Sequence, residues 1–116
     1  MKSKLVIDAD IFSQKLSKQI VAGKALLAVP VNTFNDFGVL RNECKKWSDF
    51  NEELLKLSFS ISENEYKDEY KKCFIAFGSI GNLSLDERCK NFKETIQKRI
   101  ICLESIHNRI EIISIT

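Results

Sequence analysis

Apolar residues recur at every third or fourth position through almost the whole of this 116-residue chain. That spacing is the period of one face of an α-helix, whereas a strand alternates at every second residue. One proline and four glycines are too few for the many tight turns of an all-β domain. The sequence therefore predicts an all-α fold, a helical bundle formed as one domain over residues 1–116.

Residues that typically begin helices divide this pattern into four segments. The helices are expected over residues 9–28, 33–58, 62–77 and 84–113. Asp8 or Asp10 can accept hydrogen bonds from the free backbone N–H groups at the start of the first helix. Capping-box sequences, in which the cap residue and the residue three positions later exchange hydrogen bonds, begin at Thr33, Ser62 and Ser84.

The two longest segments determine the expected architecture. At 1.5 Å per residue, the helices over 33–58 and 84–113 would span about 38 Å and about 45 Å. We expect them to form an antiparallel pair, with the shorter third helix returning between them. Residues 109–116 are rich in β-branched side chains, so they form either the frayed end of the last helix or the start of a strand. A strand there would need a partner from elsewhere, in which case this domain is the N-terminal module of a longer protein.

The charged residues are balanced and dispersed. Lys and Arg number 18 and Asp and Glu number 16, which gives a net charge of +2. Nucleic-acid binding depends on clustered cations that displace counterions, so this distribution does not favour a nucleic-acid partner. No apolar run approaches the about 20 residues of a membrane span, and no signal peptide is recognisable. These features predict a cytoplasmic protein that has no membrane partner.

The four cysteines do not form a recognisable metal or redox motif. Cys44, Cys73, Cys89 and Cys102 are too widely spaced for a C-x-x-C pair, which argues against a zinc ribbon and a thioredoxin-like site. Each lies at or beside an apolar position of a predicted helix. We therefore expect reduced thiols that pack as small core residues.

Few residues suggest catalysis. The only histidine, His107, lies beside the isoleucines of the last predicted helix, with Glu104 and Glu111 within about one turn. One histidine cannot supply the two Glu-x-x-His motifs of a di-iron bundle, and the separation of Arg99 from His107 differs from the arginine–histidine motif of helical HEPN ribonucleases. Phosphate-binding glycine loops and nucleophile elbows are also missing. The expectation is therefore no catalytic residue, no cofactor and no metal.

Aromatic residues are the best candidates for a binding site. Trp47, Phe50 and Asn51 lie on or beside one face of the second predicted helix, and Tyr66 and Tyr70 lie one turn apart on the third. Stripes with this spacing usually belong to a core, where Asn51 would be a buried polar residue that fixes helix register. Alternatively, Trp47 and the tyrosines are anchors for a partner protein, because such residues dominate interface energetics.

Several segments carry a resemblance to a known group of proteins. They are Gly-Lys-Ala-Leu-Leu-Ala-Val-Pro-Val at 23–31, Trp-Ser-Asp-Phe-Asn-Glu-Glu-Leu-Leu at 47–55, two Glu-Tyr pairs within 65–70, and Leu-Glu-Ser-Ile-His-Asn-Arg-Ile-Glu at 103–111. Their order resembles the helical region that precedes TIR-like nucleotide-binding domains and other effector domains in bacterial defence-type proteins. The resemblance implies a coupling or oligomerisation module. The catalytic or sensing residues of that group lie in the following domain, so the resemblance implies no active-site residue here.

These observations predict a non-enzymatic helical module that binds a protein partner or a second copy of itself, as a homodimer, and that is coupled to a bacterial defence-type effector. The isoleucines that continue to the end of the last helix would supply apolar surface for the second copy. The alternative is a stand-alone small cytoplasmic regulator, of phage or mobile-element type, that binds another protein. A helical nuclease ranks behind both.

Overall fold

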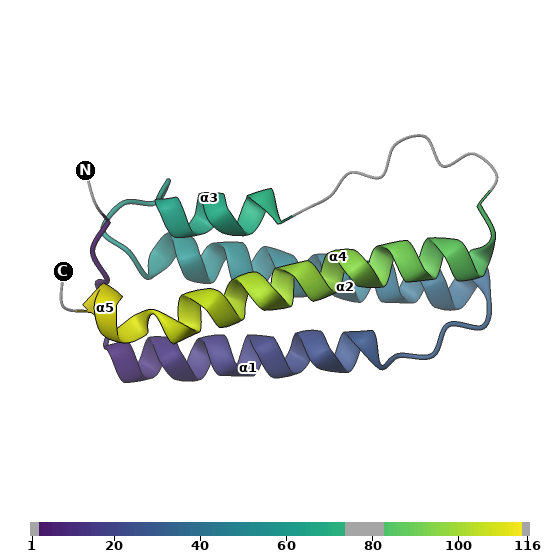
Figure 1. The fold of residues 1–116 in the computed structure, drawn as a ribbon, viewed down its shortest axis with the longest axis horizontal. Helices are drawn as coiled ribbons and strands as arrows, with labels where there is room; N and C mark the ends of the chain where they lie inside the picture. The colour runs from purple at the N-terminus through teal and green to yellow at the C-terminus, as the bar shows by residue number, and fades with distance from the viewer. Residues whose placement is uncertain (1–2, 74–82, 115–116) are drawn as a thin grey trace.

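Helices make up most of the described chain. The structure is a computed structural model, and it describes residues 3–73 and 83–114. Its helices are α1 (Ala9–Leu27), α2 (Phe34–Leu57), α3 (Glu65–Lys72), α4 (Leu85–Asn108) and α5 (Ile110–Ser114). Among these residues, β pairing is limited to one isolated bridge between Leu5 and Phe59. The predicted all-α bundle is confirmed (Figure 1).

Three helices begin at the caps predicted from the sequence. The carboxylate of Asp8 accepts hydrogen bonds from two backbone N–H groups in the first turn of α1. The Thr33 hydroxyl accepts one from the N–H of Asp36 at 3.0 Å. Ser84 and Glu87 form the predicted capping box at the start of α4. Each cap satisfies N–H groups that have no acceptor within the helix, which fixes where the helix begins.

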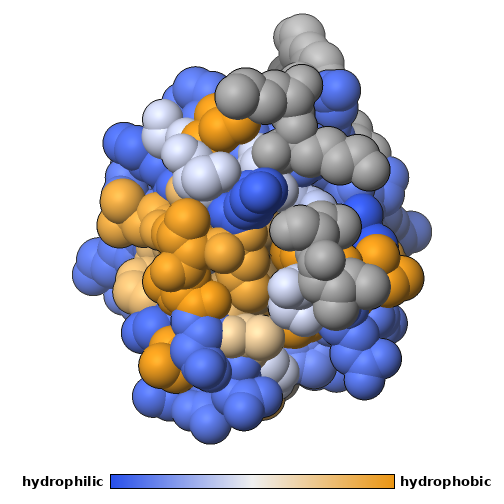
Figure 2. Space-filling model, turned by 90° about the vertical axis from the view of Figure 1, so that its left-hand side faces the viewer, coloured by the Kyte–Doolittle hydropathy of each residue, from blue (hydrophilic) through white to orange (hydrophobic). Residues whose placement is uncertain are grey.

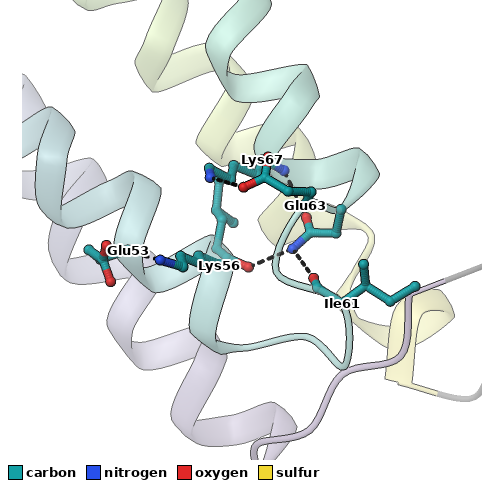
Figure 3. A network of polar contacts seen from close by, with 7 residues as sticks. Glu53, Lys56, Ile61, Glu63 and Lys67 are labelled. Atoms are coloured by element: carbon teal, nitrogen blue, oxygen red, sulfur yellow. Dashed lines mark hydrogen bonds and ion pairs between the residues drawn. The ribbon is translucent and has the colours of Figure 1, made fainter.

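The third helix does not begin at the predicted capping box. Its cap is Asn64 rather than Ser62, and the Asn64 side-chain oxygen accepts a hydrogen bond from the N–H of Lys67 at 2.8 Å. The Asn64 amide also donates to the backbone oxygens of Leu55 and Ile61, both at 2.9 Å (Figure 3). The cap thereby binds the last turn of α2, which the exposed Ser62 does not do. The predicted end of this helix at residue 77 lies outside the described residues.

The last predicted helix is two helices. The continuous segment expected over 84–113 is interrupted at Arg109, whose backbone leaves the helical conformation with φ −99° and ψ 5°. The chain then forms α5, so the end is helical rather than a strand. The interruption lets Ile110 and Ile113 both turn into the core. The Arg109 side chain meanwhile forms an ion pair with Glu69 of α3.

The longest antiparallel contact is between α1 and α4. The Ser13 hydroxyl, near the start of α1, lies 3.0 Å from Nε2 of His107, near the end of α4. Beyond the end of α1, the backbone oxygen of Val29 accepts a hydrogen bond from Lys93, near the start of α4, at 2.8 Å. The two helices therefore run in opposite directions along the bundle (Figure 1).

The predicted antiparallel pairing of segments 33–58 and 84–113 is wrong in direction. The rings of Phe37 and Phe92, near the starts of α2 and α4, lie 5.7 Å apart, so these two helices run the same way (Figure 1). The reason is topological. Because α3 returns along the bundle before α4 begins, α2 and α4 share a direction in this up-down-up-down order.

Gly23 brings three helices close together. An added Cβ at this position would lie 2.6 Å from Cζ2 of Trp47 on α2 and 2.8 Å from Cγ1 of Ile100 on α4. Both distances are shorter than carbon atoms tolerate. Only glycine therefore permits α1 to pack this closely, and this approach places the Trp47 indole between α1 and α2.

Residues before α1 cross the end of the bundle. The N–H of Val6 donates to the Ser58 oxygen at 2.8 Å, and the N–H of Ser60 donates to the Lys4 oxygen at 2.7 Å. These bonds surround the Leu5–Phe59 bridge and hold the N-terminal segment beside the end of α2. The start of α1, the end of α2 and α5 meet at this end of the molecule (Figure 1).

Candidate protein-interaction surfaces

Trp47 belongs to the core. Only 6% of its surface is exposed, and its indole N–H donates to the backbone oxygen of Gln19 at 2.8 Å. A buried indole needs such an acceptor, because an unpaired N–H in an apolar environment costs about 1–3 kcal/mol. The hydrogen bond joins α2 to α1 beside Gly23. For Trp47, the structure thus supports the core alternative over that of an exposed partner anchor.

Asn51 and Tyr70 form a buried polar contact between α2 and α3. The Tyr70 hydroxyl accepts a hydrogen bond from the Asn51 amide at 2.9 Å and lies 3.0 Å from the Ser48 hydroxyl. Asn51 and Tyr70 are 0% and 1% exposed. Burial raises the pKa of Tyr70. The hydrogen bonds with Ser48 and Asn51 oppose this rise. The predicted burial of Asn51 is therefore confirmed, and neither side chain is available to a partner.

Tyr66 holds α3 against the segment that follows α2. Its ring stacks on Phe59 with the centroids 4.5 Å apart, and the Arg109 guanidinium lies 5.8 Å from the Tyr66 centroid. Tyr66 is half-buried, and burial raises its pKa. Its contacts are internal, so it acts first as a packing residue.

Phe50 is the one predicted anchor that remains open to solvent. It is 50% exposed and lies with an edge of Trp47 in a groove of about 310 Å³ between α1 and α2. Ala22 and Leu26 form the apolar wall on α1, while Glu43 and Lys46 contribute charge on α2. We call this the α1–α2 groove. It brings together two of the five predicted residues, Trp47 and Phe50.

A second exposed apolar surface lies at one end of the bundle. Four aliphatic side chains there are exposed: Val6 by 58%, Ile11 by 49%, Leu57 by 67% and Ile112 by 64%. They come from the N-terminal segment, α1, α2 and α5, which meet at this end. Figure 2 shows apolar residues gathered on this face with hydrophilic residues around them. We call these four residues the end patch.

The end patch differs from the surface expected from the last helix. Within α4 and α5, which are described throughout, Ile96, Ile100, Ile106, Ile110 and Ile113 are buried in the molecule's own core. Ile101 and Ile112 are the exposed isoleucines of these two helices. Helical spacing could not reveal the patch, because its members belong to four segments that only the fold brings together.

His107 connects helices and has the surroundings of a structural residue. Its Nε2 lies 3.0 Å from the Ser13 hydroxyl and 3.1 Å from the Ser17 hydroxyl, both on α1. Nearby, Lys24 of α1 and Glu104 of α4 form an ion pair at 3.4 Å. These contacts bind α1 to α4 beside a depression that Glu104 and His107 both line. His107 itself is half-buried, beside the isoleucines of α4 as its place in the sequence indicates.

The thiols and carboxylates of the described residues are not assembled into a metal site. In residues 3–73 and 83–114, no group of three or more His, Cys, Asp or Glu side chains is placed to hold a metal ion. All four cysteines are unpaired; Cys44 and Cys102 are buried, whereas Cys73 and Cys89 are half-buried. Burial raises the pKa of Cys44 and of Cys102.

None of the described helices is both long enough and apolar enough to cross a bilayer.

Comparison of the chain with protein-family models, curated proteins and solved structures gave no match.

Proposed function

We propose that this chain is a non-enzymatic helical interaction module that self-associates through the end patch. The observation that carries the proposal is that Val6, Ile11, Leu57 and Ile112 are exposed at the end of the bundle where Figure 2 shows apolar residues gathered. Apolar residues gathered on one face and surrounded by polar ones are typical of interaction sites. Scattered exposed aliphatic residues would carry no such meaning.

A second copy of the chain is the partner that this surface favours. The end patch consists of aliphatic groups, which pack without directional hydrogen bonds, so two identical patches are compatible with each other. A twofold axis would place each patch against its equivalent, as in most homodimers. Burial of each side chain would contribute about 1–2 kcal/mol before the cost of association is subtracted.

The test is the mass of the protein in solution as its concentration is raised from micromolar to millimolar. Light scattering or sedimentation equilibrium should show a monomer–dimer equilibrium for the unaltered chain. Ile112→Asp should weaken that association at least tenfold, because it places a charge in the apolar contact. Ile112 is largely exposed, so the substitution should leave the fold intact.

Val39→Asp is the matched control. Val39 is 54% exposed and lies near the start of α2, at the opposite end of the bundle from the end patch. It should leave the association constant unchanged. A monomer at every concentration, or equal weakening by both substitutions, would contradict self-association through the end patch.

The wider context is also a proposal. The sequence resemblance supports a role for this cytoplasmic module in assembling a bacterial defence-type effector. The alternative is a small stand-alone regulator, which is favoured by the α1–α2 groove because its exposed Phe50 and the Trp47 edge could receive an apolar side chain of another protein. If the chain is a stand-alone regulator, Phe50→Ala should remove binding of the partner protein. If it is a self-associating module, Phe50→Ala should leave dimerisation unchanged.

A further inference from the structure

Two cysteines lie together where α3 meets α4. Cys73 ends α3 as its C-cap residue and is half-buried, whereas Cys102 lies in the second half of α4 and is 5% exposed. Both line a groove of about 410 Å³ between these helices, which Lys72 and Lys98 also line. They are separated by 29 positions in the sequence, so only the fold brings them together.

One residue, Glu69, connects the two thiols. The Cys73 thiol donates to the backbone oxygen of Glu69 at 3.4 Å, and the Cys102 thiol donates to the Glu69 carboxylate at 4.0 Å. Arg109 forms an ion pair with the same carboxylate, which holds it at the groove. Burial raises the pKa of Cys102. The hydrogen bond with Cys73 raises this pKa further.

We propose that Cys73 and Cys102 form an intramolecular disulfide when the protein meets hydrogen peroxide. The half-buried Cys73 is the residue that peroxide can reach, and the buried Cys102 is the second thiol that lines the same groove and hydrogen-bonds to the same residue, Glu69. Together they form a redox modification site that joins α3 to α4. This inference is independent of the proposed self-association.

The reaction has two steps. In the first, the sulfur of Cys73 attacks one oxygen of peroxide, the O–O bond breaks, and Cys73 becomes a sulfenic acid while the other oxygen leaves as water with the thiol proton. In the second, the sulfur of Cys102 attacks the sulfur of Cys73 and the S–O bond breaks. Glu69 accepts the proton of Cys102 and passes it to the departing hydroxide, which leaves as water. Two thiols thereby lose two electrons, and one peroxide becomes two waters.

The expected consequence is a more stable molecule. The bond would close a loop of 29 residues and restrict the unfolded chain. Closure of a loop of that size should raise Tm by about 5–15 °C. The covalent link would also fix α3, which is the shortest helix that packs along the bundle.

The tryptic pattern of the sequence makes the test direct. Cleavage after Lys and Arg places each cysteine in a different peptide: residues 42–45, 73–88, 89–90 and 100–109. After treatment with hydrogen peroxide, the non-reduced digest should contain peptide 73–88 joined to peptide 100–109. Thiol titration of the denatured protein should fall from four groups to two, and the protein should remain a single chain without a disulfide-linked dimer.

Single substitutions separate the two partners. In Cys102→Ser the sulfenic acid of Cys73 should persist and react with dimedone, whereas Cys89→Ser should give the same cross-link as the unaltered protein. Cys89 is the matched control because it too is half-buried. Mapping of the unaltered protein decides the question even if a variant fails to fold. Four free thiols after peroxide, a cross-link to residues 42–45 or 89–90, or a disulfide between two chains would each overturn the proposal.

Discussion

At the scale of single residues, close packing rather than exposure explains most of the aromatic side chains. Trp47 and Tyr70 each have a hydrogen-bond partner inside the bundle. Asn51 is less completely satisfied: among the described residues no donor reaches its side-chain oxygen. A buried unpaired oxygen of this kind costs about 1–3 kcal/mol. Asn51 therefore places a polar contact between α2 and α3 at some cost in stability.

Gly23→Ala should destabilise the protein by about 1–3 kcal/mol, because its Cβ would collide with Trp47 and Ile100. Gly38→Ala is the control, since a Cβ there meets nothing within 4 Å. Gly38 lies inside α2, so this change should stabilise the protein by about 0.5–1 kcal/mol. Denaturant unfolding of the two variants should give effects of opposite sign. Equal changes in the free energy of unfolding would show that α1 does not pack closely against Trp47 and Ile100 at Gly23.

At the scale of helices, the ends are determined by side chains that satisfy backbone groups across the fold. Asn64 illustrates this, because its amide binds the last turn of α2 while its oxygen caps α3. Nearby, Lys67 and Glu63 form an ion pair at 2.8 Å, and Lys56 with Glu53 form one at 4.0 Å (Figure 3). Glu63 and Glu53 are exposed, so these pairs contribute little.

Asn64→Ala should therefore cost about 2 kcal/mol or more, since it removes a cap and leaves buried backbone oxygens without their donor. Ser62→Ala should change the free energy of unfolding by less than about 0.5 kcal/mol, because Ser62 is exposed. Urea unfolding of both variants measures the difference. If Ser62→Ala lowered the free energy of unfolding more than Asn64→Ala, the cap of α3 would be Ser62, as predicted from the sequence.

At the scale of the whole molecule, several buried or half-buried acidic groups couple stability to alkaline pH. Burial raises the pKa of Cys44, Cys102, Tyr66 and Tyr70. In the unfolded chain, thiols ionise at about pH 8.5 and tyrosines at about pH 10, which are their ordinary pKa values. The folded protein retains these protons at pH values where the unfolded chain releases them. This contribution to stability is therefore complete below about pH 8.5 and is lost as the pH rises further.

The free energy of unfolding, measured in urea with a reductant present, should fall steadily from about pH 8.5 upwards. Cys102→Ala should lower stability at neutral pH but flatten the slope above about pH 8.5, because it removes one of the groups that titrate there. Parallel curves for this variant and the unaltered protein would contradict the assignment to Cys102.

The sequence by itself determined the helical class and most helix boundaries. The spacing of apolar residues and the caps at Asp8, Thr33 and Ser84 are local features, and local hydrogen bonds are sufficient to fix where these helices begin. The helical spacing of Phe12, Leu16, Ile20 and Gly23 also places this glycine on the apolar face of the first helix, but spacing does not explain why a glycine is needed there.

Only the tertiary structure decided which helices run antiparallel, where the last helix is interrupted and which side chains meet. Asn64 caps α3 because the end of α2 lies beside it, and Arg109 interrupts the last helix where its side chain binds Glu69. The end patch and the Cys73–Cys102 pair combine residues from separate segments. Periodicity specifies which face of a helix is apolar, but the partner of that face depends on the free energy of packing the whole chain, which no single segment contains.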